Sequence, residues 1–149
     1  MWEKKPLSIS VVIITLNRAD WLSQTLSSLC YQSRMAEEVI IVDNGSTDHT
    51  KDTVESFKDK LNIKYIKEEK RGIPFARNAG IKCASTEIVA FIDDDCVAHK
   101  DWLKHIELTF LRDPNIGIVG GEVSHLKSSD AIVDEFYSKN MLSFFEEKK

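Results

Sequence analysis

The residues best suited to do chemistry are three consecutive aspartates, Asp93, Asp94 and Asp95, which follow the apolar run of residues 87–92. Neighbouring carboxylates repel each other by about 1 kcal/mol in water and by about 4 kcal/mol near a protein surface. Alternate side chains of an extended chain point the same way, so Asp93 and Asp95 can reach one cation together. Oxygen ligands of this kind suit Mg²⁺ or Mn²⁺. The triplet predicts a divalent metal site, and the alternative is a solvated acidic turn that caps the next helix.

The aspartates need a fold to position them, and apolar runs that alternate with longer amphipathic stretches indicate which one. Because the runs are almost continuously apolar, they suit strands that are covered on both faces of a parallel sheet. Five such runs predict strands, at residues 8–15, 38–42, 63–67, 87–92 and 116–119. Four stretches predict helices, near residues 20–32, 48–60, 74–84 and 100–112. Strand and helix in strict alternation predict a layered α/β domain with a mostly parallel central sheet.

Local signals mark the expected helix ends. Asp20 is a candidate cap for the first helix, and Asp48 or one of the two residues before it is a candidate cap for the second. Pro74 suits the first turn of the third helix, where its missing N–H costs nothing. That helix also presents a stripe of small residues, which predicts an unusually close approach to the sheet: Ala76, Ala79, Gly80 and Cys83.

Composition limits the classes of protein to consider. The chain has 149 residues, of which 42% are hydrophobic and 30% charged, and we expect residues 1–149 to form a single globular domain. A formal net charge of −4 argues against nucleic acid as a partner. The three cysteines of the chain follow no CxxC spacing, which favours reduced thiols and a cytoplasmic location. A peripheral position at the cytoplasmic face of the membrane is left open. The apolar runs are too short to span a membrane.

An aromatic-rich helical pattern at residues 132–145 stands apart from the rest of the chain. The simplest interpretation is a helix that packs on the domain. The alternatives are a surface that awaits a partner or more chain, or one that contacts a membrane surface. The pattern also predicts self-association.

Polar residues follow the predicted strands at the points where the strands end. In a parallel sheet these carboxyl ends lie on one edge, which is where ligands of open α/β sheets bind. The candidates on that edge are Thr15, Asn17, Arg18, Asp43, Asn44, the residues 68–71 and the aspartate triplet. Neither GxGxxG after the first strand nor GxxxxGK[ST] occurs, so a bound diphosphate needs a metal to neutralise it. Asp43 and Asn44 can hydrogen-bond a base edge, or they form a plain turn before a capped helix.

Four motifs in order resemble glycosyltransferase family 2: residues 10–18 (SVVIITLNR), 40–48 (IIVDNGSTD), 71–80 (RGIPFARNAG) and 91–95 (FIDDD). The resemblance extends from about residue 8 to residue 123. It implies the GT-A fold, a Rossmann-like α/β/α layering. It also implies an inverting transferase that moves a sugar from a UDP-, GDP- or dTDP-sugar to a hydroxyl of a glycan, lipid or protein acceptor.

The resemblance also implies roles for individual residues. Thr15 and Asn17, with Arg18 beside them, are expected to line the nucleotide pocket. Asp43 and Asn44 are expected near the base, and Arg71 and Arg77 near the base or the diphosphate. Asp93 or Asp94 is expected at the ribose, and Asp95 at the Mn²⁺ or Mg²⁺ ion that binds the diphosphate.

The chain departs from the family pattern in two places. Asn44 stands where many members have a second aspartate, and the chain stops soon after the triplet. Members place the general base on a later segment, so we assign no catalytic base and expect a C-terminally truncated, donor-binding portion that transfers poorly. The main alternative is a non-catalytic α/β nucleotide-binding or scaffold domain that retains the fold. An aspartate-based phosphatase or receiver domain is disfavoured, because the triplet follows the fourth strand and no assisting lysine is identifiable.

Overall fold

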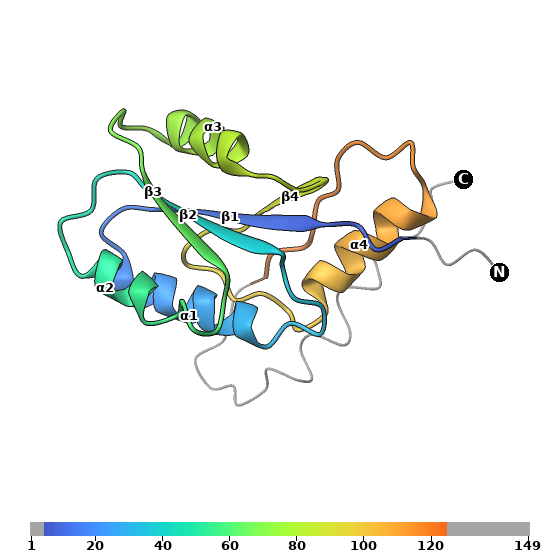
Figure 1. Ribbon diagram of the computed structural model, residues 1–149, viewed down its shortest axis with the longest axis horizontal. Coiled ribbons are helices and arrows are strands. Elements are labelled where there is room, and N and C mark those ends of the chain that lie inside the picture. Colours follow the sequence, from blue (N-terminus) through green and yellow to red (C-terminus); the bar gives the residue numbers. More distant parts are fainter. Residues whose placement is uncertain (1–4, 125–149) are drawn as a thin grey trace. The chain divides into compact units, whose positions relative to one another are not determined.

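The structure, a computed structural model, describes residues 5–124. Residues up to Arg112 belong to one compact unit, and residues from Asp113 onward belong to a second. Strands and helices alternate through the first unit (Figure 1) in the order β1 (Ile9–Thr15), α1 (Ala19–Cys30), β2 (Glu38–Asp43), α2 (Thr50–Glu55), β3 (Ile63–Lys67), α3 (Ile73–Cys83), β4 (Ile88–Phe91) and α4 (Trp102–Arg112). The alternation predicted from the apolar pattern is confirmed for these elements.

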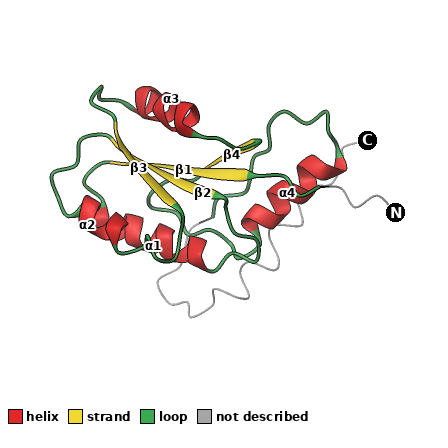
Figure 2. Ribbon diagram, viewed as in Figure 1, coloured by secondary structure: helices red, strands yellow, loops and turns green. Residues whose placement is uncertain are grey.

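The four strands form one sheet in the order β3-β2-β1-β4, and every neighbouring pair is parallel. Helix α3 covers one face, while α1, α2 and α4 pack on the other (Figure 2). Successive residues of β1 illustrate the consequence: Val11 and Ile13 face the cluster with α1, and Val12 faces the cluster with α3. Burial on both faces explains why the strand sequences are continuously apolar. The predicted α/β layering with a parallel sheet is confirmed.

Helix α3 lies unusually close to the sheet, as its stripe of small residues predicts. A Cβ atom added to Gly80 would stand 2.4 Å from Cγ1 of Val12 and 3.3 Å from Cγ2 of Val42. Contacts shorter than 3 Å are not sustained by real carbon atoms, so only glycine fits here without movement of the helix. Pro74 occupies the first turn of α3, as expected.

Two local predictions need correction. Asp20 does not cap α1: the N–H of Ala19 donates instead to Oδ2 of Asp48 at 3.2 Å, across from the next loop. The second helix was expected to continue to residue 60, but α2 ends at Glu55. Beyond it the N–H groups bond three residues back, from Phe57 to Val54 for example, so residues 56–60 form tighter turns. Asp48 does serve the start of α2, because its Oδ1 accepts the N–H of Thr50 at 3.0 Å.

The strand predicted at residues 116–119 is wrong. Residues 113–124, the described part of the second unit, contain neither helix nor strand. Ile118 and Val123 are 92% and 84% exposed there. A strand requires a neighbouring strand to pair with, and a short apolar run cannot form one alone. The aromatic pattern at 132–145 lies outside the described residues. Within the described ones, no helix combines the length and the apolar character needed to cross a bilayer.

Candidate functional site

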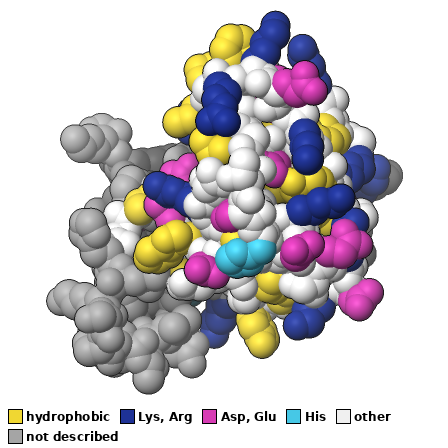
Figure 3. Space-filling view, turned by 90° about the vertical axis from the view of Figure 1, so that its left-hand side faces the viewer, with side chains coloured by type: hydrophobic (Ala, Val, Ile, Leu, Met, Phe, Trp, Pro, Cys, Tyr) yellow, Lys and Arg dark blue, Asp and Glu magenta, His cyan; other side chains and the backbone are white. Residues whose placement is uncertain are grey.

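The carboxyl ends of all four strands lie on one edge of the sheet, because every pair is parallel. Thr15 pairs with Asp43, and Asp43 pairs with Lys67. The last pair between β1 and β4 is Val12 with Phe91, so β4 ends slightly before the other strands. Figure 3 looks onto the side of the molecule at the left of Figure 1, where acidic and basic side chains are interspersed. The sheet therefore brings the predicted polar residues to one rim, as the sequence pattern indicates.

The aspartate triplet follows β4 as a turn, closed by a hydrogen bond from the N–H of Cys96 to the carbonyl of Asp93 at 3.2 Å. Ligand atoms of Asp93, Asp95 and Cys96 all lie within 4.8 Å of one another. The two carboxylates are exposed and hence accessible to a cation. The two carboxylates are hard oxygen ligands that suit Mg²⁺ or Mn²⁺, whereas the Cys96 thiol is a soft one, so Asp93 and Asp95 are the part of the cluster that fits the predicted ion.

Side chains of α1 and of the residues that follow it hold this turn through the turn's main-chain atoms. The hydroxyl of Thr25 lies 2.9 Å from the carbonyl oxygen of Asp94 and 2.7 Å from that of Cys96. Ser28 accepts the N–H of Ala98 at 2.9 Å. Gln32 donates to the carbonyl of residue 99 at 2.6 Å and accepts the N–H of residue 103 at 3.1 Å.

Thr25 and Ser28 lie three residues apart on one side of α1, and Gln32 lies just beyond the C-terminal end of that helix. Sequence reasoning missed these three residues. The available signal was a row of polar side chains on a helix that also carries buried leucines. Their role is to position the turn, because their partners are main-chain atoms of residues 94–103.

Arg18 joins the loop after β1 to the triplet. Its Nη1 donates to Oδ1 of Asp94 at 3.2 Å and to Oδ2 of Asp95 at 2.9 Å. Burial raises the pKa of the Asp94 carboxyl, although Arg18 opposes that effect. Asp94 raises the pKa of Arg18 in turn. Thr15 is buried, and its hydroxyl forms no well-aligned hydrogen bond, although it lies near enough to Asp94 to favour the charged carboxylate.

Asp43 and Asn44 are both buried at the end of β2. Oδ1 of Asp43 accepts the N–H groups of Gly45 and Ser46 at 3.1 and 2.7 Å, and Oδ2 accepts the Tyr65 hydroxyl. Burial acts to raise the pKa of Asp43, but these hydrogen bonds outweigh it and lower the value. A charged, fully oriented carboxylate at this edge suits a hydrogen-bond donor on a ligand.

The side-chain amide of Asn44 holds the loop after β3. Its Nδ2 donates to the carbonyls of Glu68 and Lys70, each at 2.8 Å, and its Oδ1 accepts the N–H of Gly72 at 2.8 Å. Both amide hydrogens therefore have main-chain partners. In this arrangement Asn44 holds the loop that carries Arg71, and its predicted contact with a base stays a prediction.

Asn17 links the loops after β1 and β2. It adopts a left-handed conformation with φ of 54°, which asparagine tolerates better than most residues. Its Oδ1 accepts the N–H groups of Thr47 and Asp48 at 2.7 and 3.3 Å, and its own N–H donates to the Ser46 hydroxyl at 2.9 Å. Asn17 thus connects the two loops, and its predicted place in the nucleotide pocket stays a prediction.

The two predicted arginines lie on different parts of the rim. The Arg71 guanidinium approaches Gly45, with Nη2 3.5 Å from the position of an added Cβ atom. Gly45 has φ of 102°, so any other residue at that position would have a strained backbone. Arg77 lies over the ring of Phe91, 5.9 Å from its centre, next to the triplet. Both arginines are exposed and can reach a ligand on this edge.

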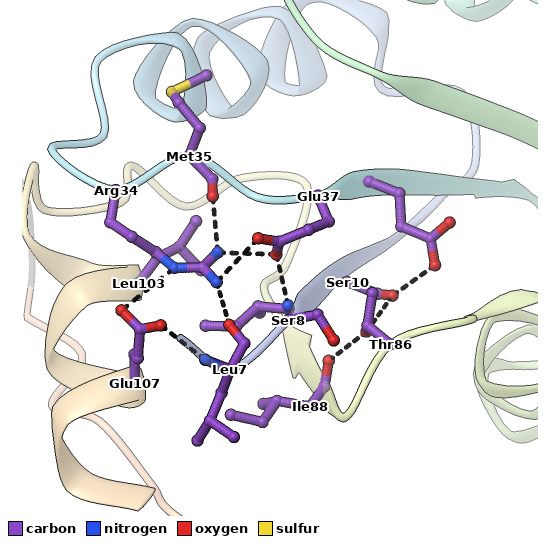
Figure 4. Close-up of polar contacts among 12 residues, drawn as sticks. Leu7, Ser8, Ser10, Arg34, Met35, Glu37, Thr86, Ile88, Leu103 and Glu107 are labelled. Atoms are coloured by element: carbon purple, nitrogen blue, oxygen red, sulfur yellow. Dashed lines mark hydrogen bonds and ion pairs between the residues drawn. The ribbon is translucent and has the colours of Figure 1, made fainter. Parts of the chain in front are cut away.

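The opposite edge of the sheet carries a separate polar network, which sequence reasoning also missed (Figure 4). Arg34 donates to the carbonyls of Leu7 and Met35 and pairs with Glu37 at 2.9 Å. It also faces Glu107 of α4 at 3.5 Å. These contacts fasten α4 and the entry to β1 to the loop after α1, which is a structural role far from the strand ends that carry the triplet.

A family model described as glycosyl transferase family 2 matches residues 10–146. The chain belongs to glycosyl transferase family 2. It is 41% identical over 102 residues to validoxylamine A glucosyltransferase of Streptomyces hygroscopicus subsp. jinggangensis, which covers 66% of this chain and 24% of that protein. It is 34% identical over 134 residues to glycosyltransferase AglE of Haloferax volcanii, which covers 87% of this chain and 43% of that protein. The chain thus spans less than half the length of these curated relatives.

Solved glycosyltransferase structures share the fold. TarS residues 1–349 of S. aureus in complex with UDP match with a TM-score of 0.68 and 31% identity, over 80% of this chain and 38% of that one. The mannosyltransferase PcManGT of Pyrobaculum calidifontis, in complex with GDP-Man and Mn²⁺, matches with a TM-score of 0.65 and 26% identity, over 85% of this chain and 39% of that one. The GT-A architecture implied by the sequence motifs is confirmed.

Proposed function

We propose that this chain is the donor-binding part of an inverting glycosyltransferase, which moves a sugar from a nucleoside-diphosphate sugar to an acceptor hydroxyl with the help of Mn²⁺ or Mg²⁺. The observation that carries the proposal is that Asp43 ends β2 and the aspartate pair Asp93 and Asp95 follows β4, in a parallel sheet whose strands have their carboxyl ends on one edge. The complexes of similar proteins with UDP and with GDP-Man and Mn²⁺ support it.

Each part of the edge has a proposed task. Asp95, with Asp93 beside it, holds the metal, which when bound supplies the Lewis acid that stabilises the departing diphosphate. Asp43 accepts a hydrogen bond from the base, because its carboxylate is charged and fixed by three donors. Asn44 contributes by holding the loop of Arg71, whose guanidinium is suited to a diphosphate or a base carbonyl.

Transfer also needs a general base that takes the proton of the acceptor hydroxyl. We assign none of the described residues to that task, and we propose donor binding as the activity that this chain carries. Thr15 and Arg18 complete the proposed pocket at the end of β1, since both face the Asp94 carboxyl at the base of the triplet.

The experiment is a calorimetric titration of the purified chain with UDP, GDP and dTDP, each with Mn²⁺ and again with EDTA. Binding of one diphosphate that requires Mn²⁺ supports the proposal and identifies the base. A folded chain that binds none of the three refutes it, and the scaffold alternative then accounts for the chain.

A point substitution tests the metal ligand. We expect Asp95→Asn to weaken Mn²⁺-dependent binding of the diphosphate by at least tenfold, which corresponds to about 1.4 kcal/mol. The matched control is Asp59→Asn, which removes the same charge from an exposed position in the turn of residues 56–60. Equal affinities of the two variants would remove Asp95 from the metal site.

A further inference from the structure

The Asp95 carboxylate is both the proposed metal ligand and a partner of the Arg18 guanidinium. Asp95 belongs to the cluster whose ligand atoms lie within 4.8 Å of one another, yet its Oδ2 already accepts a hydrogen bond from Nη1 of Arg18 at 2.9 Å. The same nitrogen lies 3.2 Å from Oδ1 of Asp94. One guanidinium therefore bridges a buried carboxylate and an exposed one, and the exposed one is the proposed metal ligand.

We infer that Arg18 is a resident counter-ion of the triplet, which a divalent cation must displace from Asp95 in order to bind. The inference rests on the proposed metal site. The two carboxylates differ in the way that an exchange requires: the Asp94 side chain is only 8% exposed, whereas that of Asp95 is 45% exposed. The pair with Asp94 holds the arginine in place while its contact with Asp95 is given up.

The balance of energies allows this exchange. The Arg18 side chain is 51% exposed, and exposed ion pairs are weak because water screens them. A divalent ion attracts a carboxylate more strongly than a single delocalised charge does, so it competes successfully for Asp95. The guanidinium nevertheless opposes binding, since it occupies one ligand oxygen and repels the incoming cation. Arg18 therefore lowers the affinity of the free chain for metal.

The displacement of Arg18 predicts that a substitution beside the metal site raises the affinity for Mn²⁺. We expect Arg18→Gln to bind Mn²⁺ at least threefold more tightly than the wild-type chain when no nucleotide is present. Arg18→Lys keeps the charge and is expected to fall between the two. A residue that merely supports the structure would weaken Mn²⁺ binding when it is replaced, so the direction of the change separates the two roles.

The measurement is the free Mn²⁺ signal in electron paramagnetic resonance during titration of each purified chain. Lys51→Gln is the matched control, because it removes one positive charge from an exposed position in α2, outside the candidate site residues. We expect its Mn²⁺ affinity to stay within twofold of wild type. Adding Asp95→Asn to Arg18→Gln is expected to abolish the gain.

A change in metal affinity must be distinguished from a folding defect, because Arg18→Gln leaves the buried Asp94 carboxylate without its cation. The comparison is therefore repeated in an Asp94→Asn background, with circular dichroism confirming that each variant is folded. Equal or weaker Mn²⁺ binding without Arg18 in both backgrounds would overturn the inference while leaving the metal site in place. No Mn²⁺ binding by any chain would overturn both the inference and the metal-assisted part of the proposed function.

Discussion

Replacing Gly80 by alanine tests how closely α3 lies against the sheet. The added methyl carbon would stand 2.4 Å from Cγ1 of Val12, where carbon atoms normally keep about 3.5–4.0 Å. Val12 is fully buried in β1, so its methyl groups have no free space into which they can turn. The second neighbour, Cγ2 of Val42 at 3.3 Å, restricts the opposite direction. The helix must therefore move outward by roughly 1 Å.

The expected magnitude is the difference of two effects. Overpacking of a well-packed core costs about 1–3 kcal/mol, with larger values for rigid neighbours. Alanine regains about 1 kcal/mol relative to glycine inside a helix. We expect a net loss of about 1–2 kcal/mol in the free energy of unfolding, because both neighbours of Gly80 are β-branched and stiff. For a domain of this size, that loss corresponds to a Tm lower by roughly 2–8 °C.

Urea unfolding followed by circular dichroism measures this loss. Gly117→Ala is the control, since a Cβ atom there has no neighbour within 4 Å. Combining Gly80→Ala with Val12→Ala should cost less than the sum of the two single changes, because the second substitution makes room for the first. A Gly80→Ala chain as stable as wild type, or more stable by the helix-propensity gain, would refute the close approach.

Two further predictions concern a buried carboxylate and the support of the triplet. Burial acts to raise the pKa of Glu38, but hydrogen bonds from Lys64 and two serines lower it from 4.5 to about 2. A lowered pKa adds stability that is complete above pH 4.5 and is lost as the pH falls toward 2, by up to about 3 kcal/mol. Urea unfolding from pH 7 to pH 3 should show this loss, and Glu38→Gln should flatten it; an unchanged slope would contradict the assignment. Thr25→Val should cost about 1–3 kcal/mol, because it leaves the carbonyls of Asp94 and Cys96 without their hydroxyl donor. It should also weaken Mn²⁺ binding severalfold in the resonance titration, whereas Mn²⁺ binding equal to that of a Ser27→Ala control would show that α1 does not position the turn.

Much of this arrangement could be predicted from the sequence because it depends on local patterns. Continuous apolar runs indicated strands buried on both faces, and their strict alternation with helices indicated a parallel sheet with all carboxyl ends on one edge. The stripe of small residues around Gly80 predicted the close packing of α3. In each case the information lies within a few neighbouring residues and the physics of one element.

The features that escaped prediction depend on partners far away in the sequence. Asp48 serves two helices because the loops after β1 and β2 lie side by side, which no local pattern reveals. The side-chain amide of Asn44 holds the loop after β3, a role that its own place after β2 does not indicate. The run at 116–119 has the composition of a strand, but the described residues of its unit, 113–124, contain no strand to pair with it. A strand's existence depends on its neighbour, so composition alone overstated it.

The contacts that fix the position of the aspartate turn do not involve the side chains that give the turn its chemistry. Thr25, Ser28 and Gln32 bond to main-chain atoms of residues 94–103, which every amino acid sequence supplies apart from the N–H that proline lacks. The exposed side chains of Asp93 and Asp95 can therefore change without loss of the hydrogen bonds that fix the turn, whereas the buried Asp94 is held by its pair with Arg18. A designer could exchange the two exposed carboxylates for amides on an unaltered frame. Metal dependence in such a scaffold is an adjustable property of two side chains.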